Sequence, residues 1–175
     1  MDAKQGLQPT SLTFRALESG DENLLFLWEN DRSLWPEGVT VQPWSKEVLK
    51  QYVSGIQDIY TDRQLRLVLE SMGNPVGLLD LFDFDPKHRR AGVGVLIADP
   101  DLRGKGLGKA ALQLLETYAR ESLFMRLLHA DIAASNTASL ALFEACGFEK
   151  TGVKPGWLLT QSGPVDVYHY QKMFG

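Results

Sequence analysis

Hydrophobic and polar residues alternate over residues 12–16, which is the two-residue period of a strand with one buried face. Asp21 then precedes apolar residues at helical spacing, so we expect it to cap a helix that ends near Asn30. The period is lost over residues 31–44, and Ser45 is expected to cap a second helix. The first part of the chain therefore predicts one strand and two helices.

The middle of the chain predicts a meander of three strands. Residues 65–70 and 76–84 have the character of strands, and the short turn at 72–75 joins them into an antiparallel hairpin. A third strand is expected at about residues 90–98. Helices and strands alternate after it, and the expected elements are a helix at 109–122, a strand at 126–133, a helix at 137–146 and strands at 148–154 and 165–173.

Composition limits the class of protein. A chain of 175 residues with 44% hydrophobic content can bury one sizeable core, so we expect residues 1–175 to form a single domain, with residues 1–10 as a flexible N-terminus. The formal net charge is −4 and no long run of like charge occurs, which argues against a nucleic-acid partner. No stretch reaches the roughly 18 apolar residues of a membrane helix, and the N-terminus lacks a signal-peptide pattern. We therefore expect a cytoplasmic protein with no membrane partner.

The chain has one cysteine, Cys146, so an internal disulfide cannot form and a metal site of several thiolates is excluded. Nothing near it supplies a base, and we expect it to be a small buried hydrophobic residue. We expect no bound metal.

A glycine-rich turn carries the strongest chemical signal. A strand over residues 93–98 is followed by a short loop, then by the turn over residues 103–108, and then by a helix from Lys109. Glycines at alternate positions let consecutive backbone N–H groups converge on an anion at the positive end of the helix. Arg103 and Lys109 can add positive charge, so the turn predicts a phosphate site.

Two common phosphate-binding folds fit this turn poorly. A Walker A loop needs Ser or Thr after its Gly-Lys pair and a glycine five residues before it, but here Ala110 and Arg103 stand at those places. The dinucleotide fingerprint is a closer rival, since Gly106, Gly108 and Ala111 fit its glycine pattern and an acidic residue follows downstream. That fingerprint should begin where its strand ends, and here five residues intervene. We disfavour this alternative without discarding it.

The turn and the segments around it resemble the GNAT superfamily of acetyltransferases. The family's acetyl-CoA motif is Gln or Arg, two residues, Gly, one residue, and Gly or Ala, and residues 103–108 satisfy every position. The stretch from Asn136 to Phe148 is similar to the family's second motif, in which an Asn heads a helix that ends in Gly-Phe. With residues 166–168, the resemblance covers residues 12–173.

The resemblance implies an α/β (α+β) fold of the GNAT type. Its central sheet is mixed and mostly antiparallel, has six to seven strands and about four flanking helices, and is splayed at a bulge. It also implies acetyl-CoA as co-substrate. The family binds pantetheine along the splayed strand, and the implied cofactor-binding residues are Leu96, Ile97, Ala98, Arg103, Gly104, Lys105, Gly106, Leu107, Gly108, Lys109 and Asn136. Asn136 is also a good helix N-cap, and both roles stay open.

The resemblance leaves the catalytic acid in doubt. Many relatives have a tyrosine on the helix of the second motif, and Phe143 occupies that place here. Tyr118 and Tyr168 are substitutes to consider, although each is an ordinary core aromatic in a plain structural interpretation. Without a tyrosine, we expect catalysis by positioning, with backbone donors on the thioester carbonyl and water carrying protons.

Acidic residues suggest the kind of acceptor. The strand over residues 76–84 is apolar except for its carboxylates, and strand alternation places Asp80 on one face and Asp83 on the other unless a bulge intervenes. Asp83 is the tentative catalytic residue, as a proton relay or a substrate contact. The pattern over residues 77–92 resembles polyamine acetyltransferases, and the expected substrate-binding residues are Glu29, Asp31, Trp35, Asp80 and Asp83.

The sequence therefore favours an N-acetyltransferase that acetylates a small-molecule primary amine, with a polyamine or diamine such as spermidine as the preferred acceptor. One alternative is a protein N-terminal acetyltransferase of the ribosomal-protein type. Another is a non-catalytic acyl-CoA-binding sensor, which Phe143 keeps open. A homodimer is also left open.

Overall fold

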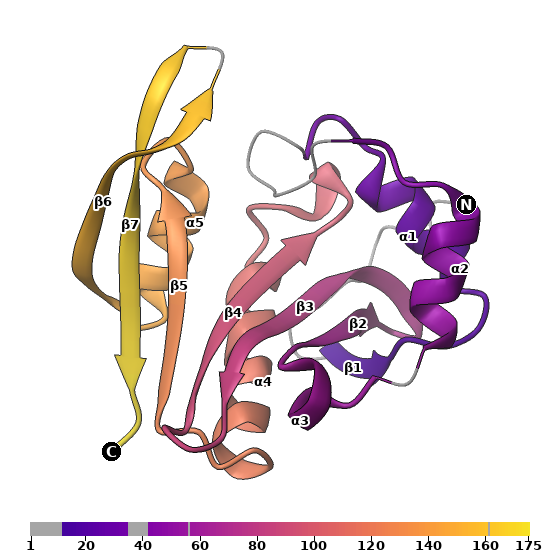
Figure 1. Cartoon of the computed structure of the whole chain (residues 1–175), viewed down its shortest axis with the longest axis horizontal. Coiled ribbons are helices and arrows are strands. Elements are labelled where there is room, and N and C mark those ends of the chain that lie inside the picture. Colours follow the sequence, from indigo (N-terminus) through magenta and orange to yellow (C-terminus); the bar gives the residue numbers. More distant parts are fainter. Residues whose placement is uncertain (1–11, 35–41, 56, 161) are drawn as a thin grey trace.

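The protein is described by a computed structural model that covers residues 12–34, 42–55, 57–160 and 162–175 (Figure 1). Seven strands and five α-helices occur in these residues, with a short 3₁₀ turn, η3, at Pro100–Leu102. The strands are β1 (Leu12–Ala16), β2 (Leu65–Ser71), β3 (Asn74–Asp85), β4 (Arg90–Ile97), β5 (Leu127–Ala133), β6 (Glu149–Thr160) and β7 (Gly163–Met173). The helices are α1 (Glu22–Glu29), α2 (Lys46–Ser54), α3 (Ile59–Asp62), α4 (Leu107–Glu121) and α5 (Thr137–Ala145).

The strands form one open, mixed sheet in the order β1-β2-β3-β4-β5-β7-β6. Every neighbouring pair is antiparallel except β4 and β5, which are parallel. These two strands pair only from Arg90 with Leu127 to Gly92 with His129. Beyond that point they separate, and the sheet splits into two wings that open toward the top of Figure 1. The predicted mixed, mostly antiparallel and splayed sheet is confirmed.

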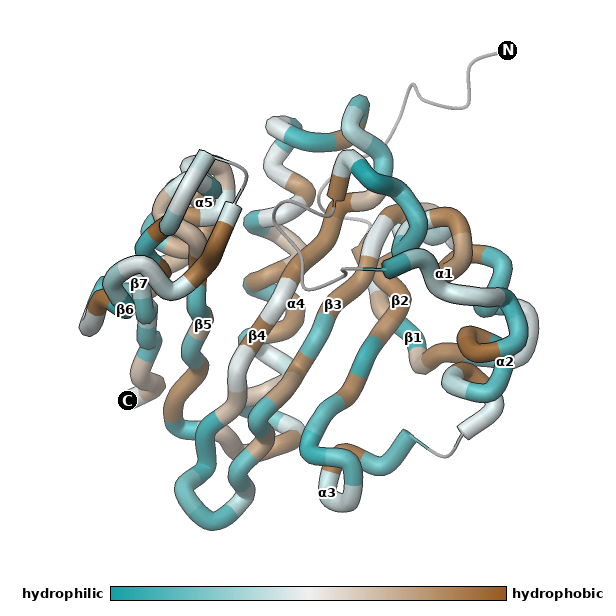
Figure 2. Tube along the Cα trace, turned by 45° about the horizontal axis from the view of Figure 1, so that its top comes forward, coloured by the Kyte–Doolittle hydropathy of each residue, from teal (hydrophilic) through white to brown (hydrophobic). Residues whose placement is uncertain are grey.

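Helices cover both faces of the sheet. Helices α4 and α5 pack on one face, where Leu79, Leu112 and Leu128 belong to the larger hydrophobic core. Helices α1 and α2 cover the other face of the β1–β4 wing, and Leu25 and Leu78 belong to that second, smaller core. Burial of one such leucine contributes about 1.5–3 kcal/mol. In Figure 2 the brown, hydrophobic stretches gather on the central strands and on the helices beside them.

Most predicted elements occur close to their expected bounds, and the exceptions have local causes. Ser45 caps α2 as expected, because its side chain accepts a hydrogen bond from the N–H of Val48 at 3.2 Å. Asp21 precedes α1 but does not cap it, since its carboxylate binds the guanidinium of Arg15 at 2.7 Å instead. Helix α3 was not predicted because it is a single turn of four residues.

A β-bulge near the end of β3 corrects the expected strand alternation. The register with β4 shifts between Phe82 and Asp85. Asp83 has a φ of 48°, in the left-handed region, and its side chain is exposed. Phe84 takes the next inward position and packs in the same core as Leu81. The bulge thus keeps an apolar ring in the core and turns Asp83 outward.

Candidate active site

The glycine turn before α4 forms a cradle for an anion. Gly104 and Gly106 have φ angles of 71° and 83°, a conformation that side chains disfavour, and Gly106 is the N-cap of α4. The first N–H groups of a helix have no partner inside it. Those of Leu107 and the residues after it therefore face the turn, at the positive end of a 15-residue helix. This arrangement suits the pyrophosphate of acetyl-CoA.

Arg103 fixes the turn to the end of β4. Its Nε donates to the carbonyl oxygen of Ile97 at 3.0 Å, and its Nη2 donates to that of Ala98 at 3.3 Å. Asp31 lies close enough to be affected by this guanidinium. The hydroxyl and backbone N–H of Ser33 lower the pKa of the Asp31 carboxyl, and the charge of Arg103 adds to that effect. Asp31, predicted to bind the acceptor, thus lies toward the cofactor turn.

The splay of the sheet leaves one edge of β4 facing a gap. The N–H of Ala98 donates to Val76 on the β3 side at 3.0 Å. Main-chain polar groups alternate sides along a strand, so those of Val95 and Ile97 face the gap while those of Leu96 and Ala98 face β3. Of the three residues expected to pair with pantetheine, Ile97 presents its backbone N–H to the gap, while its carbonyl oxygen accepts the hydrogen bond from Arg103. Val95 shares that position and was not among the predicted residues, although the same alternation could have identified it.

The second motif has a structural role in the fold. Asn136 caps α5, because its Oδ1 accepts a hydrogen bond from the N–H of Ser139 at 3.0 Å. That bond uses the amide oxygen, and the predicted cofactor contact would use the amide nitrogen. Phe143 is 4% exposed and packs edge-on against Phe148, with ring centroids 4.9 Å apart.

Neither substitute tyrosine lies at the glycine turn. Tyr118 packs against Phe14 and stands 12 residues after Gly106 along α4, which is roughly 18 Å. Tyr168 is half-buried, and the ammonium group of Lys150 lies 3.1 Å from its ring centroid. Both rings thus have packing partners in the fold, and a role for either tyrosine as the acid stays a prediction.

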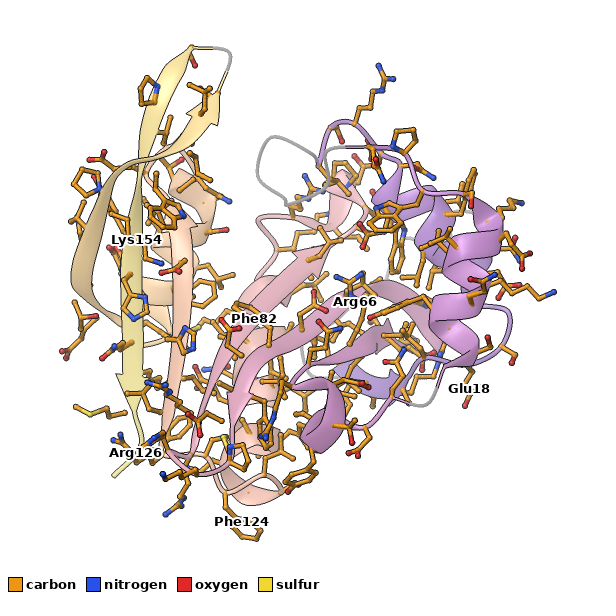
Figure 3. The ribbon with its side chains drawn as sticks, viewed as in Figure 1. Glu18, Arg66, Phe82, Phe124, Arg126 and Lys154 are labelled. Carbon is orange, nitrogen blue, oxygen red and sulfur yellow. The ribbon has the colours of Figure 1, made fainter. Side chains whose placement is uncertain are left out.

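A network of ion pairs occupies two of the carboxylates expected to hold the acceptor. Arg66 donates from Nε to Asp80 at 2.7 Å and from Nη1 to Glu29 at 2.6 Å (Figure 3). One guanidinium against two carboxylates leaves one net negative charge. Arg66 and Asp80 are opposite each other in the β2–β3 hairpin, so the hairpin register was the signal that could have revealed this pair.

Asp83 lines a broad hollow of about 1010 Å³ on the sheet face opposite α4. The hollow lies where β4 and β5 meet, and its lining also includes Arg63, Asp85, Lys87, Arg90, Arg126, His129 and His169. Asp83 makes no ion pair with a described residue, and it is the expected substrate carboxylate with the greatest freedom to bind a ligand. Trp35, the remaining predicted residue, lies outside the described residues.

A polar cluster on the β5–β7 wing was missed by the sequence analysis. His169 contacts Asp131 through Nδ1 at 2.7 Å and the amide nitrogen of Gln171 through Nε2 at 3.1 Å. The amide nitrogen can only donate, so this pair of bonds places the proton of a neutral His169 on Nδ1. His129 lies beside it, with ring centroids 5.5 Å apart. Polar residues at alternate positions of two late strands were the available signal.

Burial lowers the pKa of His129, and the proximity of His169 lowers it further, while the charges of Asp83 and Asp131 oppose these effects. The Nδ1 of His129 is buried and has no hydrogen-bond partner among the described residues. The ring is therefore neutral near pH 7. No group of three or more His, Cys, Asp or Glu in the described part of the chain is placed to hold a metal ion, and no helix there is long and apolar enough to cross a membrane.

Comparisons with known proteins agree with this geometry. The spermidine N(1)-acetyltransferase of Escherichia coli (strain K12) is 27% identical over 146 residues, which are 81% of this chain and 75% of that protein. An N-acetyltransferase 9-like protein of Nematostella vectensis is 39% identical over 83 residues, which are 47% of this chain and only 40% of that protein.

The crystal structure of spermidine N-acetyltransferase from Vibrio cholerae, in complex with CoA and spermine, superimposes with a TM-score of 0.83 at 25% identity. The match covers 94% of this chain and 96% of that one. The Acetyltransferase (GNAT) family itself matches residues 24–148. The splayed sheet, the glycine cradle and these matches agree, and the chain belongs to the GNAT family, as an acetyl-CoA-dependent N-acetyltransferase.

Proposed function

We propose that this N-acetyltransferase acetylates a primary amine of a polyamine or diamine such as spermidine. The observation that carries the proposal is Asp83, an exposed carboxylate turned outward by the bulge, on the sheet face opposite α4. A polyamine must lose one proton to react, while its other ammonium groups stay charged and can be held by a carboxylate. The similarity to spermidine acetyltransferases over most of the chain supports the same acceptor.

The chain's own residues would act mainly by binding and orienting. The N–H groups after Gly106 would hold the pyrophosphate, and the backbone of Val95 and Ile97 would align the pantetheine along the gap. Acetyl-CoA supplies the activated acetyl group. With Phe143 buried at the place of the usual tyrosine, protons would leave the amine and reach the departing thiol through water.

A protein α-amine is the second candidate, and the charge of the hollow favours it. Arg63, Lys87, Arg90 and Arg126 line the hollow against two carboxylates, Asp83 and Asp85. This excess of positive charge would suit an acceptor with acidic groups, whereas a polyamine would need Asp83 for its charge contact. The two candidates differ in what they need from Asp83.

A panel of amines separates the candidates. Release of CoA is followed with spermidine, putrescine, ethanolamine and short peptides as acceptors. We expect spermidine to react fastest, and Asp83→Asn to raise its KM about fivefold, as expected for loss of a partly shielded charge contact, while the KM of acetyl-CoA stays constant. Glu121→Gln removes the same charge from the exposed end of α4 and serves as the control. Peptides that react as well as spermidine, or a silent Asp83→Asn, would favour the protein acceptor.

A further inference from the structure

Positive charge gathers near the place where β4 and β5 meet, although the chain as a whole carries a formal charge of −4. Arg63, Lys87, Arg89 and Arg126 are exposed there, and none makes an ion pair with a described residue. We call these four side chains the basic surface. They come from the end of α3, the turn between β3 and β4, and the start of β5. Figure 3 shows Arg126 at the bottom of the molecule.

The hollow described above makes this surface concave. Arg63, Lys87 and Arg126 belong to its lining, which encloses about 1010 Å³. The nearby acid Asp85 is already engaged, because it pairs with Arg90 at 3.3 Å and accepts the N–H of His88 at 2.9 Å. Asp83 is then the one carboxylate of the lining left to oppose the cations. The hollow therefore keeps an excess of positive charge.

Hydrogen bonds to the backbone hold two of these side chains in place. The Nε of Arg89 donates to the carbonyl oxygen of Phe124 at 2.6 Å, and the Nε of Arg126 donates to that of His88 at 3.2 Å. Each bond uses one N–H of the guanidinium and leaves its charge uncompensated. The remaining N–H groups of both guanidinium groups are hydrogen-bond donors, so a ligand that accepts hydrogen bonds would suit them.

The backbone around the basic surface is unusually strained. Five non-glycine residues in the described ranges have positive φ, and four of them lie here: Arg63, Asp83, Arg89 and Phe124. A bulky residue such as Phe124 rarely adopts this conformation, and its ring is 66% exposed. Strain of this kind collects at sites that bind ligands. An exposed aromatic ring beside fixed guanidinium groups offers both an apolar and an electrostatic contact.

We propose that the basic surface binds an acidic segment of a polypeptide, with glutamate or aspartate side chains on the four cations and an apolar side chain against Phe124. The extent of the surface over three segments of the chain suits an extended peptide better than a single small anion. The net charge of −4 opposes a long polyanion such as nucleic acid. The peptide is proposed as a binding partner and not as the acceptor, so the proposal does not depend on which amine is acetylated.

Fluorescence anisotropy with the whole protein tests this. The probe is a labelled peptide of eight residues with four glutamates and one phenylalanine, and the comparison probe has glutamine at the four positions. We expect the acidic probe to bind more tightly, and Arg63→Glu with Lys87→Glu to weaken it about tenfold. Lys46→Glu with Lys50→Glu changes the net charge by the same amount from exposed positions on α2, away from the basic surface and the glycine turn, and each single change serves as a further control. These controls should change the affinity less than twofold.

Three results would overturn the proposal. The first is equal binding of the acidic and glutamine probes. The second is a control variant that weakens binding as much as the change at Arg63 and Lys87. The third is a single-stranded DNA of twelve nucleotides that binds more tightly than the acidic peptide. Spermidine acetylation is measured on the same samples, so failure of the polyamine proposal and failure of this one remain distinguishable.

Discussion

The cofactor end of the molecule and its proposed acceptor face differ in the groups that they offer: backbone at the first and side chains at the second. At the cofactor end, the proposed contacts come from backbone N–H groups of the glycine turn and from backbone groups of Val95 and Ile97. At the proposed acceptor face, side chains would provide them, and the ion pairs of Arg66 and the part-buried ring of His129 lie there. The cofactor is common to a large family, whereas the acceptor differs from member to member. A site made of backbone can stay constant while the side chains opposite it change.

The largest effect is expected at the cofactor end. Gly106→Val places a β-branched residue at a φ of 83°, which distorts the turn and brings a side chain to the anion site. We expect acetyl-CoA to bind at least about a hundredfold more weakly by calorimetry, or roughly 3 kcal/mol. Gly73→Val is the matched control, since Gly73 has a φ of 76° in the β2–β3 turn. Both variants should lose stability, and equal affinity in the two would refute the assignment of the turn.

The next effect tests the ion-pair network of the acceptor face. Arg66→Gln leaves Glu29 and Asp80, which are 17% and 29% exposed, without their shared partner. Because the network is part-buried, we expect the free energy of unfolding to fall by about 2 kcal/mol in urea titrations. Arg120→Gln breaks an exposed pair with Glu121 and should change it by less than about 0.5 kcal/mol. Similar losses in both variants would mean that the network adds no stability.

A smaller effect on stability is expected when His129 is protonated at low pH. Its pKa in the folded protein is lowered, so the unfolded chain binds more protons once the pH falls below the unperturbed value of about 6.5. Stability of the wild type should therefore decline between pH 7 and pH 5 more steeply than that of His129→Gln. Asp83, Arg90, Asp131 and His169 all influence this group and stay in place in both proteins. Parallel stability curves would contradict the lowered pKa.

The smallest effect is expected at Phe143. Phe143→Tyr restores the residue that many relatives have, and we expect turnover to stay within about twofold of the wild type or to rise, because the proposed mechanism moves protons through water. Acetyl-CoA affinity is measured alongside. A collapse of turnover with affinity preserved would show that the Phe143 ring has a chemical role of its own.

The fold and the cofactor end could be predicted from the sequence because their signals are local. The glycine turn needs glycines at fixed spacing, and hydrophobic periods revealed the strand before it and the helix after it. The bulge at Asp83 could not be predicted, because the residue opposite it on β4 decides which position is skipped. The pairing of Glu29 with Arg66 joins residues 37 positions apart, and no local pattern encodes that contact.

The role of each predicted site residue stays a prediction, as do the cytoplasmic location and the homodimer. Asp31 and Asp80 illustrate the reason. The sequence does not show which carboxylates form hydrogen bonds or ion pairs in the folded protein. Once such a partner is bound, the carboxylate has fewer acceptor positions left for a ligand. Residues proposed to work through their backbone, such as Gly106, depend less on side-chain partners, so their roles are easier to predict from the sequence.

The separation of β4 from β5 gives the molecule an internal sheet edge. An unpaired edge is a template for any extended chain, and proteins normally protect such edges. Pantetheine, with its two amide groups, is long enough to serve as the strand that this sheet lacks. Bound in this way, the co-substrate would complete the secondary structure as well as the chemistry. At a concentration 100 times its dissociation constant, acetyl-CoA would add about 2.7 kcal/mol to the stability, so the folded protein should resist unfolding better when acetyl-CoA is abundant.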